Sequence, residues 1–304
     1  MFSIMREIKF KYFIVSGLIL WIAVTFSSHF IPSTPSFKVK PSIHSSYVIF
    51  MEKDSGEILY NKNETKKTSP ASLTKMMTVL VALDRIESLS SKTSINPESY
   101  YYILEQNGSM AGFAPGEEVT YRDLLYGTML SSGGEAANSL ALSVSDNKQK
   151  FVDLMNEKAE KIGMNDTHFT NVEGFDDSNQ YSTAQDMALL VSEALDNEHF
   201  RVLFTTPKFR TSATSVHPEG LLLRSTVLTN LPKMANSSFS IIGGKSGTTL
   251  SAGECWVTLG EIKGKEYISV VMGSPINNFK DLPWHQKEDT LNLFSHISSE
   301  MINE

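Results

Sequence analysis

Cysteine is almost absent from this chain of 304 residues, and the single one, Cys255, excludes an internal disulfide framework. The net charge is −7, and no basic patch with interleaved aromatic residues points to a nucleic-acid partner. The seven histidines lack metal-ligand spacing, so the sequence predicts no zinc site and no other cofactor. Repeats and low-complexity tracts are also lacking, and 41% hydrophobic residues suffice for one large domain or two small ones.

The N-terminus carries the one signal for location. Three cations between positions 6 and 11 precede an uncharged run from Tyr12 to Phe26, which has the length of a signal-peptide core and is short for a membrane span. Positive charge before the run predicts that the remainder lies outside the cytoplasm. We expect residues 1–31 to be a signal peptide or an N-terminal membrane anchor, and residues 32–43 to be an extended spacer.

The first part of the remaining chain predicts a hairpin followed by a buried helix. Strands at Tyr47–Met51 and Glu57–Tyr60 flank a turn. A helix from Ala71 to about Ile86 is apolar almost all round, which is typical of a buried helix. Ser69 is expected to cap it, with Pro70 in its first turn.

Helical patterns dominate residues 91–224, and strand patterns return near residues 241–249, 254–259 and 266–272, before a last amphipathic helix at about 282–302. Strands at both ends with helices between them predict an α+β fold with one antiparallel sheet. In this prediction residues 44–304 form one catalytic domain. Its sheet part is 44–90 with 225–304, and residues 91–224 are an all-helical insertion.

Three short motifs follow one another in the order expected of a serine acyl-transfer site that uses no histidine. They are Ser72-Leu73-Thr74-Lys75, Ser132-Gly133-Gly134 and Lys245-Ser246-Gly247-Thr248. A second Ser-x-x-Lys string begins at Ser145, where a loop enters a predicted helix, and Ser145 is interpreted as a capping residue.

Together with four linking segments, these motifs resemble the serine-type D-alanyl-D-alanine carboxypeptidases, the low-molecular-mass penicillin-binding proteins. The segments are Asp54–Tyr60, Pro70–Thr78, Gly163–Phe169 and Tyr181–Asp186. The resemblance implies a β-lactamase/transpeptidase-like fold and a peptidoglycan stem peptide ending in D-Ala-D-Ala as substrate. It also implies β-lactams as covalent inhibitors, and a place on the outer face of the bacterial cytoplasmic membrane, or secretion if the signal is cleaved. Many relatives end in a β-rich domain and a C-terminal anchor, for which this chain ends too soon, so the N-terminal segment is the expected tether.

The resemblance also implies roles for the motif residues. Ser72 is the expected nucleophile and Lys75 its base, provided that burial and the charge of Lys245 lower the lysine pKa. Ser132 is expected to relay protons to the leaving amine. Lys245 is expected to bind the substrate carboxylate with the hydroxyls of two neighbours, Ser246 and Thr248. Gly247 is expected to let the substrate approach the strand, and the N–H groups of Ser72 and Thr248 to form the oxyanion hole.

Two departures from the family pattern leave alternatives open. Gly134 stands where relatives place an asparagine that orients substrate, and Ser246 stands where they place a threonine. A deacylating Glu173 would make the protein a β-lactamase; a D,D-endopeptidase on the same scaffold and a non-catalytic module that binds cell-wall peptide are further alternatives. Glu135 is interpreted as an acid at a helix N-terminus, and Cys255 as a packed hydrophobe.

Overall fold

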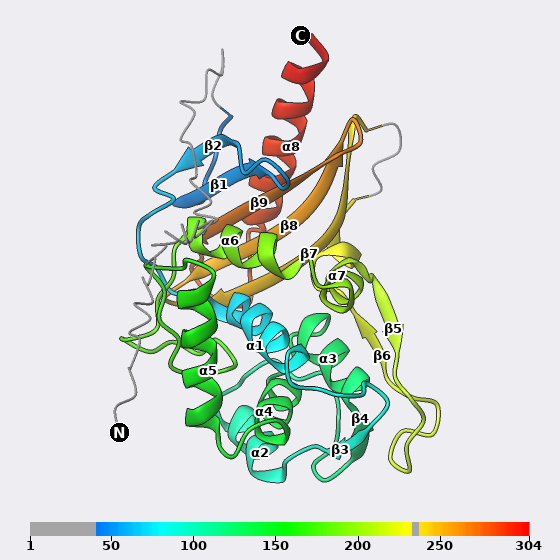
Figure 1. The fold of residues 1–304 in the computed structure, drawn as a ribbon. Helices are drawn as coiled ribbons and strands as arrows, with labels where there is room; N and C mark the ends of the chain where they lie inside the picture. The colour runs from blue at the N-terminus through cyan, green and yellow to red at the C-terminus, as the bar shows by residue number, and fades with distance from the viewer. Residues whose placement is uncertain (1–40, 233–236, 304) are drawn as a thin grey trace, which may run out of the picture.

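The computed structural model describes residues 41–232 and 237–303 (Figure 1). The predicted signal or anchor, residues 1–31, and most of the predicted spacer therefore lie outside the described residues. Within the described part, none of the helices is both long and apolar enough to cross a membrane.

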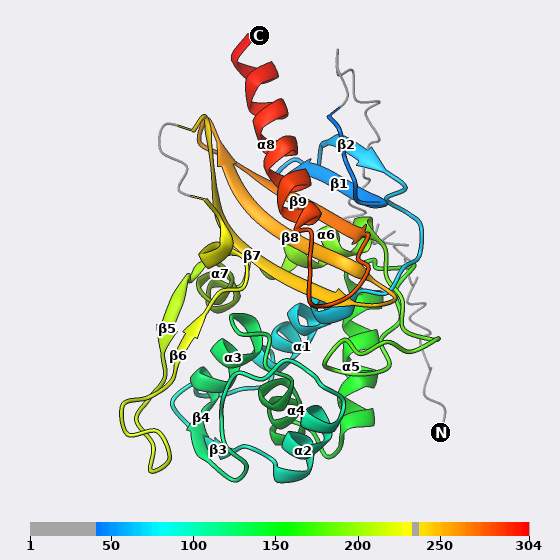
Figure 2. The same cartoon turned by 180° about the vertical axis from the view of Figure 1, so that it is seen from behind.

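A five-stranded antiparallel sheet in the order β2-β1-β9-β8-β7 forms one half of the molecule. Its strands are β1 (Tyr47–Glu52), β2 (Ile58–Lys62), β7 (Phe239–Thr249), β8 (Gly253–Ile262) and β9 (Lys265–Ser274). Pairing of β1 with β9 brings the two ends of the chain together, as the sequence predicts. One face is covered by α8 (His285–Asn303), and α6 (Ala184–Ala194) lies on the opposite face (Figures 1 and 2).

The alternation of side chains along β1 explains how the sheet separates two cores. Ile49 and Met51 are buried toward the helical half of the molecule. Val48 and Phe50 are buried on the other face, where the ring of Phe50 meets Phe294 of α8 edge to face with centroids 4.8 Å apart. Side chains are therefore buried on both faces of the sheet, and this packing fixes the position of its edge strands.

The other half is mainly helical and packs below the sheet (Figure 1). Its helices are the 3-10 turn η1 (Ala71–Leu73), α1 (Thr74–Leu83), α2 (Pro97–Glu105), α3 (Tyr121–Met129), α4 (Gly134–Ser143), α5 (Lys148–Lys161) and α7 (Glu198–Thr205). The 3-10 turn η2 (Leu228–Asn230) leads from this half toward β7.

The prediction of an all-helical insertion needs correction, because residues 91–224 also contain two small antiparallel sheets. One pairs β3 (Lys92–Ser94) with β4 (Glu118–Thr120), and the other pairs β5 (Lys208–Arg210) with β6 (Leu222–Arg224). Strands of three residues are too short to show a period-two pattern in the sequence. The α+β class itself is confirmed.

The capping prediction for Ser69 is wrong. Its hydroxyl donates a hydrogen bond to Asp176 Oδ1 over 2.9 Å, and η1 has no side-chain cap. The helix begins as a tight turn in which Ala71 has a positive φ of 47°. That conformation is uncommon for a residue with a Cβ, and it sets the backbone of the next residue, Ser72, outside the regular helix.

Candidate active site

Ser72 lies in η1, directly before the buried helix α1, and Lys75 follows one turn later. The Nζ of Lys75 donates hydrogen bonds to Ser72 Oγ over 3.0 Å and to the backbone oxygen of Glu173 over 2.5 Å. Only 3% of Lys75 is exposed, because α1 is apolar around its whole circumference. The predicted nucleophile and the predicted base are therefore in direct contact.

Burial lowers the pKa of Lys75 from its ordinary value to about 8, and the carboxylates of Glu173 and Glu135 partly oppose this shift. Burial also holds the pKa of Lys245 well below its ordinary range, and the positive charge of Lys75 lowers it further. Only a lysine in its neutral form can accept a proton, and a lowered pKa makes that form more common near neutral pH. The environment thus makes Lys75 suitable as a base near neutral pH.

Ser132 lies between α3 and α4 and forms a second pair of serine and lysine with Lys245. Its φ is 58°, a left-handed conformation that costs energy in a residue other than glycine. Lys245 Nζ donates to Ser132 Oγ over 2.9 Å and to the backbone oxygen of Ser246 over 2.7 Å. The three motifs meet at one place although they lie far apart in the sequence.

A pocket of about 820 Å³ opens where Ser72, Lys75 and Ser132 come together. Seven of the eight sequence-predicted site residues line it: Ser72, Lys75, Ser132, Gly134, Ser246, Gly247 and Thr248. The eighth, Lys245, is completely buried behind Ser132. Ser246 and Thr248 of β7 therefore border the pocket directly, whereas Lys245 reaches it only through its contact with Ser132.

Sequence reasoning missed Thr226 among the lining residues. Its hydroxyl accepts a hydrogen bond from Ser246 Oγ over 2.6 Å, and it lies in the segment between β6 and β7. A single threonine in an irregular segment carries no pattern that would reveal it. Phe279, which follows β9 and is 55% exposed, also lines the pocket and was likewise not foreseen.

Gly247 was predicted to let the substrate approach β7, but the structure shows a different need for glycine at this position. A Cβ at this position would lie 2.8 Å from the backbone nitrogen of Ser72 and 3.1 Å from that of Leu73. The edge strand β7 can pack against η1, the turn that carries Ser72, only because no side chain stands between them. The glycine thus brings the backbone of β7 and the N–H of Ser72 to one place, where the oxyanion hole is predicted.

Gly134 begins α4 with no room for a side chain. Its N–H donates to the backbone oxygen of Ser109 over 2.7 Å, and a Cβ would lie 2.8 Å from Cγ2 and 2.9 Å from Cδ1 of Ile103 in α2. The buried side chain of Ile103 therefore occupies the space that the side chain of an asparagine at position 134 would need.

The loop that carries Glu173 lines the pocket with residues 173–176. Its carboxylate is 2% exposed, accepts a short hydrogen bond from Asn138 Nδ2, and lies 3.6 Å from Lys148 Nζ. Asn138 also donates to the backbone oxygen of Gly134 over 3.2 Å. The carboxylate thus anchors the loop to α4 and α5, while the backbone oxygen of the same residue holds Lys75.

Three other sequence interpretations have clear outcomes. Glu135 lies in the first turn of α4, as expected, and accepts the backbone N–H groups of Ala111 and Gly112. Cys255 is completely buried, and burial raises the pKa of its thiol to about 12, which fits a packed hydrophobe. Ser145 is not the cap of α5, because Asn147 is, and its hydroxyl donates to the backbone oxygen of Ala141 instead.

Comparisons with known proteins agree with this geometry. Residues 34–276 match the sequence profile of the D-alanyl-D-alanine carboxypeptidases. A D-alanyl-D-alanine carboxypeptidase of Streptomyces sp. strain K15 is 31% identical over 250 residues, which cover 80% of this chain and 85% of the relative. For the carboxypeptidase DacF of Bacillus subtilis the identity is 35% over 150 residues, which cover 49% of this chain and 39% of the relative.

Solved structures show the same likeness. The crystal structure of the Streptomyces K15 DD-transpeptidase has a TM-score of 0.76 at 28% identity and covers 85% of this chain and 98% of the other. A D-alanyl-D-alanine carboxypeptidase from Mycobacterium tuberculosis has a TM-score of 0.71 at 26% identity and covers 86% of this chain and 95% of the other. Because the family profile spans most of the chain, the protein belongs to the D-alanyl-D-alanine carboxypeptidase family of serine peptidases.

Proposed function

We propose that the protein is a serine D,D-carboxypeptidase that removes the terminal D-alanine from peptidoglycan stem peptides. Ser72 Oγ attacks the carbonyl carbon of the penultimate D-alanine while its proton passes to the neutral amine of Lys75. The negative charge on the carbonyl oxygen is stabilised by the N–H groups of Ser72 and Thr248. Collapse of this intermediate breaks the peptide bond and leaves an ester on Ser72.

The leaving D-alanine needs a proton on its nitrogen, and Ser132 lies where it can supply one. Its hydroxyl is 2.9 Å from Lys245 Nζ, and both Ser132 and Lys75 border the same pocket. Ser132 takes a proton in return from the Lys75 ammonium, which restores the neutral amine of Lys75. Water then attacks the ester while its proton passes to Lys75, and Lys75 gives that proton to Ser72 Oγ as the ester bond breaks and the shortened peptide leaves. The observation that carries this proposal is the 3.0 Å contact between Lys75 Nζ and Ser72 Oγ.

The terminal carboxylate of the substrate is proposed to bind beside β7. Thr226, Ser246 and Thr248 line the pocket. The hydroxyls of Thr226 and Thr248 can donate to the carboxylate, while that of Ser246 donates to Thr226 and orients it. Lys245 contacts Ser132, and a carboxylate bound beside it would favour the charged form of this lysine. The same groups would receive the carboxylate of a β-lactam, whose ring carbonyl takes the place of the scissile one.

The arrangement of Glu173 supports a carboxypeptidase over a β-lactamase. Its carboxylate is held by Asn138 and Lys148, so a deacylating role would require it to leave both. We therefore expect the penicilloyl ester to be long-lived. A β-lactamase would release the penicilloyl group rapidly, and a D,D-endopeptidase would cleave cross-linked muropeptides as well as free stem peptides.

Penicillin G tests the proposal. Intact-protein mass spectrometry should show one penicilloyl adduct, mapped to Ser72 and absent from Ser72→Ala. Lys75→Ala should acylate about 10²–10⁴ times more slowly, the range of general-base catalysis.

Two further variants complete the test. Lys245→Ala should chiefly weaken binding of the penicillin carboxylate, and Ser145→Ala is the control, which should acylate as the wild type does. An adduct on another residue, or unchanged labelling in Lys75→Ala, would contradict the assignment, and a folded protein that never acylates would point to a binding module.

The protein is further proposed to be exported and tethered by residues 1–31 to the outer face of the bacterial cytoplasmic membrane. The basic flank and the apolar run of those residues support this. Cell fractionation of the full chain and of a chain that begins at Ser42 tests it. The full chain should pellet with membranes, and the shortened chain should not; a shortened chain that still pellets would contradict the tether.

A further inference from the structure

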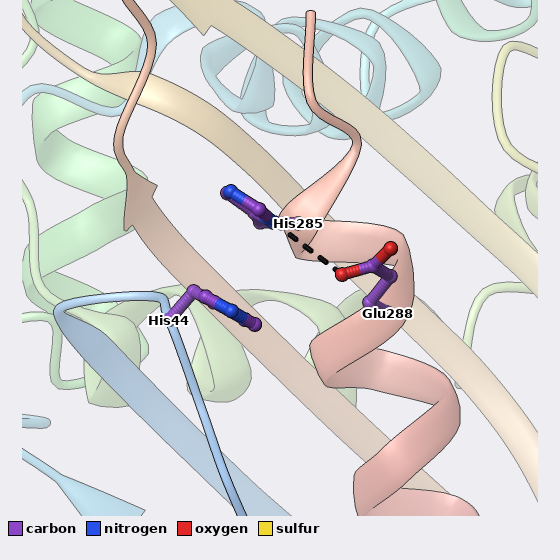
Figure 3. Close-up of side chains that lie close together, drawn as sticks. All are labelled: His44, His285 and Glu288. Carbon is purple, nitrogen blue, oxygen red and sulfur yellow. Dashed lines mark hydrogen bonds and ion pairs between the residues drawn. The ribbon is translucent and has the colours of Figure 1, made fainter.

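Two histidines and a glutamate come together on the far side of the sheet from the pocket. His44 lies in the segment before β1, whereas His285 and Glu288 lie one turn apart at the start of α8 (Figure 3). One potential ligand atom from each lies within 4.8 Å of the other two. The sequence analysis missed this set, because His44 is far from the others in the chain and a single His-x-x-Glu string is common.

The carboxylate of Asp289 contacts His44 and orients its ring as a metal ligand requires. His44 Nδ1 lies 3.1 Å from Asp289 Oδ1, and Asp289 is completely buried. The same carboxylate accepts the N–H of His44 over 2.9 Å and both the N–H and the hydroxyl of Ser45. A ring that donates its Nδ1 proton to a carboxylate keeps the lone pair of Nε2 free, the arrangement that supports many histidine ligands of zinc.

The charges around the two rings favour a cation. Glu288 Oε2 lies 3.3 Å from His285 Nδ1. With the buried Asp289, which contacts His44, this places two carboxylates beside the two imidazoles, and a divalent ion would balance their negative charge.

We propose that His44, His285 and Glu288 form a binding site for a divalent transition-metal ion of the zinc class. Two imidazole nitrogens and a carboxylate oxygen are a ligand set that Zn²⁺ accepts, with water in the remaining position. The rings of His44 and His285 are stacked with centroids 4.1 Å apart, so one ring turns for both lone pairs to converge on the ion. Their side chains are 44% and 31% exposed, which leaves room for that rotation.

A bound ion would join two segments that lead to different parts of the protein. His44 ends the stretch of chain that comes from the predicted membrane tether. His285 follows the segment 275–284, in which Phe279 lines the pocket. The ion would therefore fasten the entry of the chain to α8 and restrain the segment at the pocket rim. This site is separate from the Ser72 chemistry and does not depend on it.

Isothermal titration of the metal-free full chain in detergent with ZnCl2 tests the site. We expect one Zn²⁺ per chain, much weaker binding of Mg²⁺, and a Tm that rises with zinc concentration. His285→Gln and Glu288→Gln should each weaken zinc binding by more than about tenfold, since loss of a mere supporting partner already costs 10–100-fold. The control is His199→Gln, which changes an exposed histidine on α7 and should bind zinc as the wild type does.

Penicillin labelling of the same variants separates this inference from the proposed function. His285→Gln should still be acylated, which shows that it is folded, while its zinc affinity falls. Equal zinc affinity in the wild type and both cluster variants would overturn the inference, as would a wild type that binds no zinc. Failure of all proteins to react with penicillin would count against the proposed function and leave the zinc result standing.

Discussion

The ammonium of Lys245 lies 2.9 Å from the hydroxyl of Ser132, just as the ammonium of Lys75 lies 3.0 Å from that of Ser72. Each lysine of the site thus serves one serine, and both lysines are almost completely buried. Burial lowers the pKa of both lysines, and the charge of Lys75 lowers that of Lys245 further, so neither holds its proton as firmly as a lysine in water. This pairing explains how a site without histidine can move protons near neutral pH.

The rate of acylation should rise with pH through the pKa of Lys75, about 8. Only the neutral amine accepts the Ser72 proton, so the rate should fall about tenfold for each pH unit below that value and level off above it. Stopped-flow measurement with saturating penicillin G between pH 5.5 and 9.5 checks this. A rate independent of pH over that range would remove Lys75 as the base.

Gly134→Asn should disrupt the site, although relatives carry asparagine there. The new Cβ would lie 2.8 Å from Ile103, which is completely buried and branched at its own Cβ, so one of the two must move. Overpacking of this kind typically costs about 1–3 kcal/mol. The double variant Gly134→Asn with Ile103→Ala should recover acylation relative to Gly134→Asn alone. Equal rates in the single variant and the wild type would show that α2 yields without cost.

Gly174→Ala should cripple the enzyme by a different route. Gly174 has a φ of +88°, and a Cβ would lie 1.9 Å from the backbone oxygen of Ala71, next to the nucleophile. The end of a flexible side chain can rotate away from a new methyl group, but backbone atoms cannot. The Glu173 loop or the turn η1 must therefore move. We expect a loss of acylation together with a lower Tm. Gly163→Ala is the control, since Gly163 also has positive φ but open space around it; it should lower the Tm slightly and leave acylation intact.

The sequence predicted the parts of this protein in which apolar residues follow a regular pattern or in which a motif stands. The apolar circumference of α1 predicted the burial that lowers the Lys75 pKa, and the strand patterns at both chain ends predicted the sheet. Contacts between single residues of different segments left no such pattern. Thr226 beside Ser246 and Ile103 behind Gly134 are examples, because steric fit depends on three-dimensional packing that no local period records.

The hydrogen bond between Asn138 and Glu173 should govern both stability and the position of Lys75. Asn138→Ala leaves the buried carboxylate with Lys148 as its remaining side-chain partner within 4 Å among the described residues. Loss of one partner of a buried polar group costs about 1–3 kcal/mol, which urea unfolding can measure. Because the backbone oxygen of Glu173 holds Lys75, the loosened loop should also slow acylation. A double-mutant cycle with Glu173→Gln separates the pair from other effects. If the two changes simply add in both stability and acylation rate, the contact does not position the base.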